Sequence, residues 1–188
     1  MSMPRIGLDK AAVVEAAAVI ANRDGLPAVT LARLAQDLTV KTPSLYNHVQ
    51  SLGALHRELA LKGIIESNAV MARAAIGKAR SDAVVAIGLA YRRFALDSPG
   101  LYAASLLPPP RGDVELEAAA TEAVGTVIAV LGGFGLEGDD ALHATRGLRA
   151  IIHGFVGLES SGAFGLALDT EESFRRLLKA FCDGLGKG

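Results

Sequence analysis

Apolar residues recur along most of the chain at the three- and four-residue spacing that places them on one face of an α-helix. The first such stripe is Val13, Ala16, Ala17 and Ile20, and the second is Leu31, Leu34, Ala35 and Leu38. The sequence shows neither the two-residue alternation typical of strands nor a repeat of solenoid length. This pattern predicts an all-α fold of about nine helices.

Capping residues and helix breakers give the expected bounds. The residues in N-cap positions are Asp9, Thr30, Thr42 and Ser51, with Ser81 or Asp82 as the cap of the fifth helix. Pro43 suits the first position of the helix that Thr42 would cap. The expected helices cover residues 9–22, 30–38, 42–49, 51–80, 81–98, 99–107, 113–131, 139–160 and 170–185. A boundary near residue 50 predicts an N-terminal unit, residues 1–50, and a C-terminal unit, residues 51–188, joined by the fourth helix.

Composition excludes several classes of protein. With 51% apolar residues and a net charge of −1, the 188-residue chain is too apolar to be intrinsically disordered. Its single cysteine, Cys182, excludes an internal disulfide and a thiolate zinc cluster, and we expect it to be buried or at an interface. The apolar, charge-free stretch of residues 123–136 is shorter than the ~20 residues of a membrane helix, and early charges interrupt any signal peptide. We therefore expect a cytoplasmic protein.

Residues 30–49 carry the pattern of a helix-turn-helix. The expected inward positions are Leu31, Leu34, Ala35, Leu38, Val40, Leu45 and Val49. The outward positions of the second helix are short or polar: Thr42, Ser44, Asn47 and His48, with Lys41 just before them. No acidic residue occurs between Asp37 and Glu58, and residues 1–80 carry a net charge of +4 against −5 for the remainder. Such a face suits the major groove of DNA, because it offers donors and acceptors and does not repel phosphate.

The same stretch resembles the DNA-binding domain of the tetracycline-repressor (TetR) family of bacterial transcription regulators. The matching residues are the helix 14–20, Gly25, Thr30, Leu31, Leu34, Ala35, Leu38, Val40, the run Pro43-Ser44-Leu45-Tyr46-Asn47-His48-Val49, and Leu55. The resemblance implies that Thr42, Pro43 and Ser44 face bases. It also implies that Thr30, Tyr46 and His48 contact phosphate, and that Lys41 and Asn47 tune sequence preference.

The chain departs from the TetR pattern in two places. Thr39 occupies a turn position that is usually glycine, so it must tolerate that position's backbone angle. The lysine that usually opens the fourth helix and contacts phosphate is replaced by the run Gln50-Ser51-Leu52-Gly53. Arg5, Arg33 and Arg57 are the candidate substitutes for that lysine.

The C-terminal half is similar to a ligand-binding domain of the same family, on the run from Arg149 to Glu159 with Gly162, Phe164, Gly165 and Phe174. The resemblance implies a homodimer built from the last two long helices. The expected interface residues are Gly147, Ala150, Gly154, Gly157, Leu177, Leu178 and Phe181. The candidates for an effector pocket are Tyr91, Phe94, Tyr102, Phe134, His143, His153 and Phe155.

Other motifs have weaker functional interpretations. The run Gly133-Phe134-Gly135-Leu136-Glu137-Gly138 spells GxGxxG, but a dinucleotide site requires a parallel sheet and would not place Asp139 and Asp140 beside a pyrophosphate. His143 and His153 lack the further ligands of a metal site. We see no catalytic constellation and expect neither an enzyme nor a cofactor.

We interpret the chain as a homodimeric regulator that binds a near-palindromic DNA operator and responds to a small, mostly apolar effector, with repression favoured over activation. An activator of the same family stays open at this stage. So does a helical ligand-binding or enzymatic bundle with a vestigial DNA-binding unit.

Overall fold

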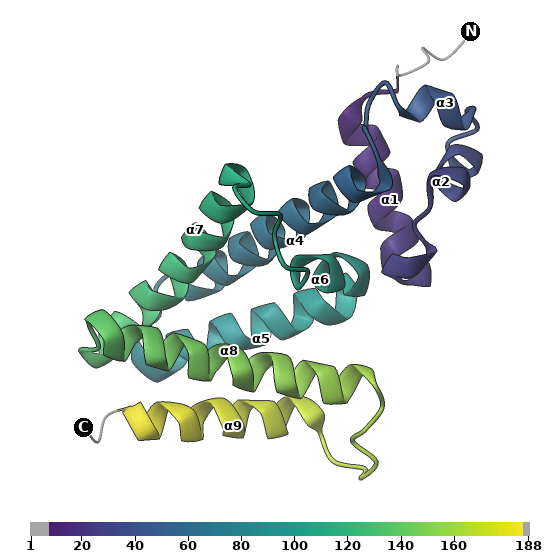
Figure 1. The fold of residues 1–188 in the computed structure, drawn as a ribbon. Coiled ribbons are helices and arrows are strands. Elements are labelled where there is room, and N and C mark those ends of the chain that lie inside the picture. Colours follow the sequence, from purple (N-terminus) through teal and green to yellow (C-terminus); the bar gives the residue numbers. More distant parts are fainter. Residues whose placement is uncertain (1–7, 186–188) are drawn as a thin grey trace, which may run out of the picture. The chain divides into compact units, whose positions relative to one another are not determined.

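The computed structural model describes residues 8–185, and over that range the chain is all-α, as predicted (Figure 1). Nine α-helices and two short 3-10 turns occur among the described residues. The helices are α1 (Lys10–Asp24), α2 (Leu31–Asp37), α3 (Thr42–Leu45), α4 (Leu52–Ala75), α5 (Arg80–Asp97), α6 (Pro99–Ser105), α7 (Val114–Leu131), α8 (Gly138–Ser160) and α9 (Thr170–Leu185). The 3-10 turns are η1 (Leu26–Ala28) and η2 (Gly132–Phe134).

Most helix ends follow the local chemistry that predicted them. The Asp9 carboxylate accepts a hydrogen bond from the Ala12 N–H at 2.7 Å and so caps α1. The Ser51 hydroxyl accepts one from the Ala54 N–H at 3.0 Å at the start of α4. The N-cap of α3 is Lys41 rather than Thr42, and no side chain caps that helix. The cap assigned to Thr42 is therefore wrong by one residue.

The bounds of α3, α4 and α5 differ from the prediction, and α3 ends at Leu45 instead of residue 49. The fourth helix ends at Ala75 instead of continuing to residue 80, and Gly77 follows with a φ of +71°. A left-handed residue cannot continue an α-helix, so the glycine ends it. The fifth helix then begins at Arg80, before both Ser81 and Asp82.

The chain divides into two compact units. The first consists of Met1–Gly63 and Ser98–Asp113, and the second of Ile64–Asp97 and Val114–Gly188. The described part of residues 1–50 lies in the first unit, together with the beginning of α4 and all of α6. The functional division at residue 50 stays a prediction.

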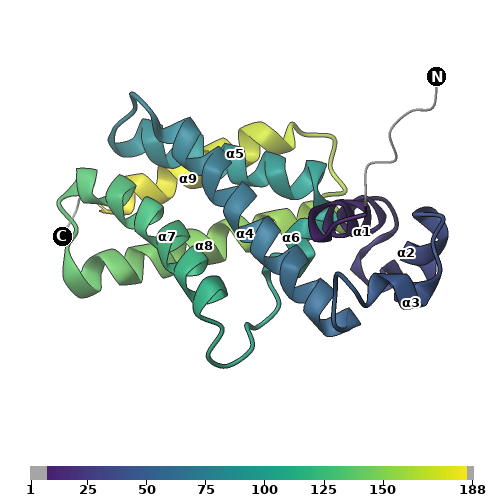
Figure 2. The ribbon, with the colours of Figure 1, turned by 90° about the horizontal axis from the view of Figure 1, so that it is seen from above.

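Close backbone contact holds α6 against α1 in the first unit (Figure 2). The Asn22 side-chain oxygen of α1 accepts hydrogen bonds from the Gly100 and Leu101 N–H groups at 3.0 and 3.1 Å. A Cβ at Gly100 would lie 2.1 Å from the Ala21 carbonyl carbon. A Cβ at Gly63 of α4 would lie 2.5 Å from the Leu101 carbonyl oxygen. The helix that follows α5 is thus packed into the unit that contains the helix-turn-helix.

Helices α5, α8 and α9 pack together in the second unit, with α8 and α9 antiparallel (Figure 1). Gly88 of α5 allows close approach, because a Cβ there would lie 2.6 Å from a terminal carbon of the buried Leu178. No single described helix is long and apolar enough to cross a membrane. One pair of described segments passes that test of length and composition when taken together. The pair is Val114–Phe134 and Gly138–Ser160, with a bend of 112° between them.

Candidate nucleic-acid interface

A small hydrophobic core holds α1, α2 and α3 together. Its buried side chains come from all three helices and the segments that flank them: Val13, Ala17, Ile20, Val29, Leu34, Ala35, Leu45 and Val49. At the start of α2 the Thr30 hydroxyl accepts a hydrogen bond from the Arg33 N–H at 3.1 Å. Three of the predicted inward residues, Leu31, Leu38 and Val40, are only half-buried. The segment therefore forms the helix-turn-helix that the sequence pattern predicted.

The turn between α2 and α3 is a Schellman motif centred on Thr39. The Val40 N–H donates to the Ala35 carbonyl at 2.9 Å, and the Thr39 N–H donates to the Gln36 carbonyl at 3.1 Å. Thr39 has a φ of +56°, in the left-handed region that a β-branched residue rarely adopts. The turn is therefore formed without the usual glycine, at a cost in backbone strain.

The surface formed by residues 41–48 brings most of the predicted DNA-binding residues together. Leu45 points inward and is fully buried, whereas Tyr46 is 55% exposed. The other exposed residues of this surface are Lys41, Pro43 and Asn47, and the half-buried ones are Thr42, Ser44 and His48. The surface thus presents hydroxyl, amide, imidazole and amine groups together with the Pro43 ring, and it carries no carboxylate.

Two of the three candidate substitutes for the missing lysine are already paired. The Arg33 side chain of α2 is 41% exposed, and its guanidinium nitrogens lie 3.2 Å from an Asp24 carboxylate oxygen and 3.3 Å from an Asp37 carboxylate oxygen. Arg57 of α4 makes two 2.7 Å hydrogen bonds to Asp113 and is only 20% exposed, so it is not available to phosphate. Arg5 lies outside the described residues. Of the residues that adjoin the turn, Lys41 is the exposed cation.

Within the second unit, the predicted pocket residues do not form one cluster. In the second unit Tyr91 contacts His153 edge to face at 5.4 Å and Phe94 at 6.3 Å, both measured between ring centroids. His143 is exposed, and Arg80 lies 5.1 Å over the Phe134 ring. Tyr102 belongs to the other unit. The effector pocket that these residues were expected to line therefore stays a prediction.

Burial determines the protonation of the one histidine in that aromatic group. Burial, with a smaller contribution from Arg149, lowers the pKa of His153 from 6.5 to about 4. The ring is thus neutral at physiological pH and packs against Tyr91.

The Cys182 thiol, buried as expected, has its pKa raised by burial.

The predicted interface residues of α8 lie on an open face. Ala150, Gly154 and Gly157 are exposed, and a Cβ built at Gly154 or Gly157 would meet no atom within 4 Å. Gly147 is half-buried against the Phe181 ring of α9.

The three predicted interface residues of α9 differ in exposure. Leu177 is 39% exposed and Phe181 is half-buried, whereas Leu178 is fully buried against Gly88 within the protomer. Leu178 is therefore a core residue, and its assignment to a dimer interface is wrong.

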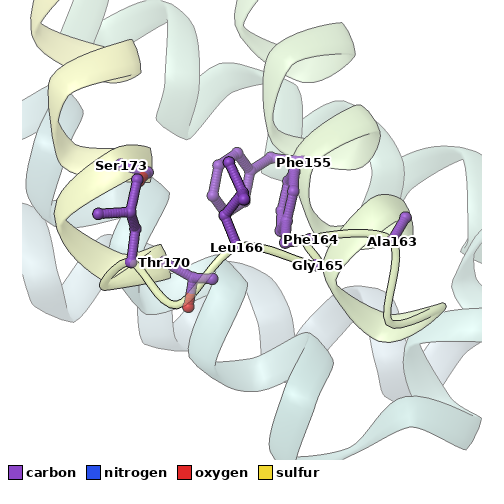
Figure 3. A pocket seen from close by; sticks show the side chains of 8 residues that line it. Phe155, Ala163, Phe164, Gly165, Leu166, Thr170 and Ser173 are labelled. Carbon is purple, nitrogen blue, oxygen red and sulfur yellow. The ribbon is translucent and has the colours of Figure 1, made fainter.

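Sequence reasoning missed a buried polar cluster and a cavity in the second unit. Arg92 of α5 makes two hydrogen bonds to Glu159 of α8, at 2.6 and 2.7 Å, although the chain separates them by 67 residues. The cavity has a volume of about 270 Å³ and lies beneath the connection between α8 and α9 (Figure 3). Of its lining residues, only Phe155 was among the predicted pocket candidates. Phe164 belongs to the residues that carry the family resemblance, and no periodic pattern marks a loop residue as a cavity wall.

Known proteins resemble the chain in both halves. Residues 84–181 match the family described as "Tetracyclin repressor-like, C-terminal domain". The HTH-type transcriptional regulator YobS of Bacillus subtilis is 36% identical over 182 residues, which cover 97% of this chain and 95% of YobS. The HTH-type transcriptional regulator Rv0681 of Mycobacterium tuberculosis is 37% identical over 179 residues, which cover 95% of this chain and 82% of Rv0681.

Solved structures share the fold. A protein of unknown function from Rhodococcus sp. RHA1 superposes with a TM-score of 0.84 at 19% identity, covering 99% of this chain and 100% of that one. A TetR protein from Acinetobacter baumannii AYE in complex with minocycline superposes with a TM-score of 0.71 at 24% identity, covering 94% of this chain and 96% of that one. Together with the family match and the two relatives, the helix-turn-helix shows that this chain is a DNA-binding transcriptional regulator of the TetR family.

Proposed function

We propose that this chain is a cytoplasmic, homodimeric repressor that binds a near-palindromic operator and is released by a small apolar effector. The observation that carries the proposal is the surface of residues 41–48, where a buried Leu45 fixes the segment and polar side chains face outward without a carboxylate. In a twofold dimer two such surfaces would enter successive major grooves, about 34–36 Å apart.

The side chains of this surface divide into two roles. Thr42, Pro43 and Ser44 are short enough to approach base edges and thymine methyl groups. Tyr46 and His48 carry donors suited to phosphate, as Thr30 does at the start of α2. Lys41 contributes the positive charge beside the turn. Phosphate contacts set affinity and register, and the residues of α3 with Asn47 set sequence preference.

Two features of the protomer support a dimer built on α8 and α9. The exposed face of α8 carries Ala150, Gly154 and Gly157, whose small size permits close approach of another helix. Leu177 adds exposed apolar surface on α9. Small exposed residues beside an exposed leucine allow the helices of two protomers to approach closely and bury apolar surface between them.

The chain connections suggest how an effector would reach the DNA-binding unit. Helix α6 is bound to α1 through Asn22 and Gly100, and it follows directly on α5 of the second unit. Helix α4 runs from the first unit into the second, and α6 begins directly after the chain returns to the first unit. A ligand that favours one conformation of the second unit would therefore act on the first unit through α4 and α6. It can shift the equilibrium only by its difference in affinity for the two states. The TetR protein in complex with minocycline has this fold and holds a small molecule.

The proposal is tested by titrating the purified chain against a fluorescent random-sequence duplex at low salt and following anisotropy. We expect binding that Tyr46→Ala weakens and Tyr46→Phe weakens less, because the phenylalanine variant loses only the hydroxyl donor. Val114→Ala, at a side chain that is 75% exposed on α7, is the control for an exposed apolar truncation. Wild-type protein that fails to bind any duplex would refute the DNA-binding part of the proposal.

Selection of bound sequences from a random DNA pool tests the assignment of roles. Ser44→Ala and Asn47→Ala should each change the preferred sequence, whereas Tyr46→Ala should weaken operator and random DNA by similar factors. Loss of operator binding alone in Tyr46→Ala would show that Tyr46 reads bases. A selected site without twofold symmetry would contradict the dimeric arrangement.

A further inference from the structure

The cavity beneath the α8–α9 connection has the size of a single-ring ligand. Its volume of about 270 Å³ exceeds the roughly 150 Å³ that accommodates benzene in an engineered protein cavity. Phe155 forms its inner wall and packs in tilted geometry between Phe174 and Phe164, with ring centroids 4.7 and 4.8 Å away. Leu166 and Leu168 of the connection line the cavity although they are 80% and 71% exposed. A ligand would cover apolar surface that water now reaches.

Thr170 and Ser173 line the side of the cavity that faces Phe155, and both of their hydroxyl groups have already donated their protons (Figure 3). The Thr170 hydroxyl donates to the Glu159 carboxylate at 2.9 Å. The Ser173 hydroxyl donates to the Asp169 carbonyl at 3.0 Å. The Thr170 hydroxyl also accepts from Arg92 Nη2 at 3.4 Å. One lone pair therefore remains on Thr170 and two remain on Ser173, and neither hydroxyl has a proton left to donate to a ligand. A ligand group that donates a hydrogen bond is therefore favoured over one that only accepts.

The wall that carries these hydroxyls is fixed by buried charge. Arg92 holds Glu159 through two short hydrogen bonds, and Glu159 in turn holds Thr170 at the start of α9. The Arg92 and Glu159 side chains are only 10% and 14% exposed. At the other end of the connection, Gly162 with a φ of +72° ends α8, and the Ala163 N–H donates to the Leu158 carbonyl at 2.9 Å. Both ends of the connection are thus anchored, which maintains an open cavity between them.

We propose that this cavity binds a small phenol-class molecule, with the ring against Phe155 and the hydroxyl donating to Ser173 or Thr170. The inference rests on the proposed function in one respect: it identifies this cavity as the site where the effector of the regulator binds. The ring would cover the apolar walls, and the phenolic O–H would supply the hydrogen bond that one of the two hydroxyl oxygens can accept.

The binding site is tested by calorimetry on the full chain without DNA. The probes are p-cresol and 4-methylanisole, which differ mainly by a methyl group that replaces the donated proton. We expect p-cresol to bind at least about fivefold more tightly. Ser173→Ala should reduce that ratio, and Leu166→Ala should weaken p-cresol by about fivefold or more. Leu96→Ala on α5, outside the cavity lining, is the matched control and should bind as wild type does.

Three results would overturn the site: no binding of either probe, equal affinity for the two probes, or unchanged affinity in Leu166→Ala. A Leu166→Ala variant that instead dissociates a dimer in sedimentation would also overturn it, because a second chain would then be the occupant. Circular dichroism of each variant shows that loss of binding does not reflect loss of fold.

A separate measurement with DNA tests the effector role. p-Cresol should weaken binding of the random-sequence duplex to wild type but not to Leu166→Ala. Binding of p-cresol with unchanged DNA affinity would overturn the effector role. Absence of DNA binding in wild type would refute the proposed function instead, and the calorimetry would still decide whether the cavity binds phenols.

Discussion

Thr39 adopts a φ of +56° within the turn of the helix-turn-helix. A non-glycine residue with this backbone conformation destabilises the folded chain by roughly 1–2 kcal/mol. Glycine removes that strain, but its greater freedom in the unfolded chain cancels part of the gain in stability. Thr39→Gly should therefore raise the free energy of unfolding by about 1 kcal/mol, measured by urea denaturation. Ala120→Gly on the exposed face of α7 is the control, and there glycine should lower it by about 1 kcal/mol. Destabilisation by Thr39→Gly would mean that the threonine side chain stabilises the turn.

His153 predicts a specific pH dependence of stability. Its pKa is about 4 in the folded chain, because of burial and then of Arg149, against 6.5 ordinarily. The unfolded chain therefore binds more protons between these values, so stability is complete above pH 6.5 and decreases as the pH falls toward 4. After allowance for partial exposure of the ring, the loss should be on the order of 1–2 kcal/mol.

His153→Phe tests this prediction, because it keeps a ring against Tyr91 and removes the titration. Urea denaturation between pH 7 and about 4.5 should show a smaller loss of stability for the variant than for wild type. Parallel profiles for the two proteins would show that His153 does not contribute to the pH dependence.

At the scale of elements, the α1–α6 contact depends on one glycine. A Cβ at Gly100 would lie 2.1 Å from a backbone atom of Ala21, so Gly100→Ala must separate the two helices. We expect it to lower the free energy of unfolding by at least about 2–3 kcal/mol in thermal or urea denaturation. Gly125→Ala on α7 is the control, because a Cβ there meets no atom within 4 Å and alanine should stabilise that helix. Equal free energies of unfolding for Gly100→Ala and Gly125→Ala would contradict the close packing of α6 on α1.

The elements also show which features a single sequence reveals. The caps by Asp9, Thr30 and Ser51 involve atoms three residues apart, so the sequence predicted those starts correctly. Helical periodicity likewise located the helix-turn-helix and its outward face. The pairing of Arg92 with Glu159 joins residues 67 positions apart, and no local pattern marks either one. Leu178 lies on the buried stripe of α9 with Phe174 and Cys182, and Gly88 of α5 leaves room for it, so the interface prediction failed there.

At the scale of the whole molecule, the proposed dimer leads to a direct test at Gly154. A Cβ at this position has open space around it, so Gly154→Trp should leave the protomer folded while obstructing another helix on the same face. Sedimentation velocity should then show monomers for Gly154→Trp and dimers for wild type. Gly125→Trp on α7, where the surroundings are equally open, is the control and should remain dimeric. A Gly154→Trp variant that sediments with wild type would place the interface elsewhere.

The return of the chain at residues 98–113 to pack with α1 affects how such regulators can be recombined. A chimera that exchanges only residues 1–50 would pair a foreign first helix with the resident α6, and would lose the match between Asn22 and the N–H groups of Gly100 and Leu101. Transplanting operator specificity into another scaffold therefore calls for a discontinuous graft that carries both segments. For the same reason, bacteria that shuffle these genes by crossover would retain a working hybrid more often when the parents agree at these positions.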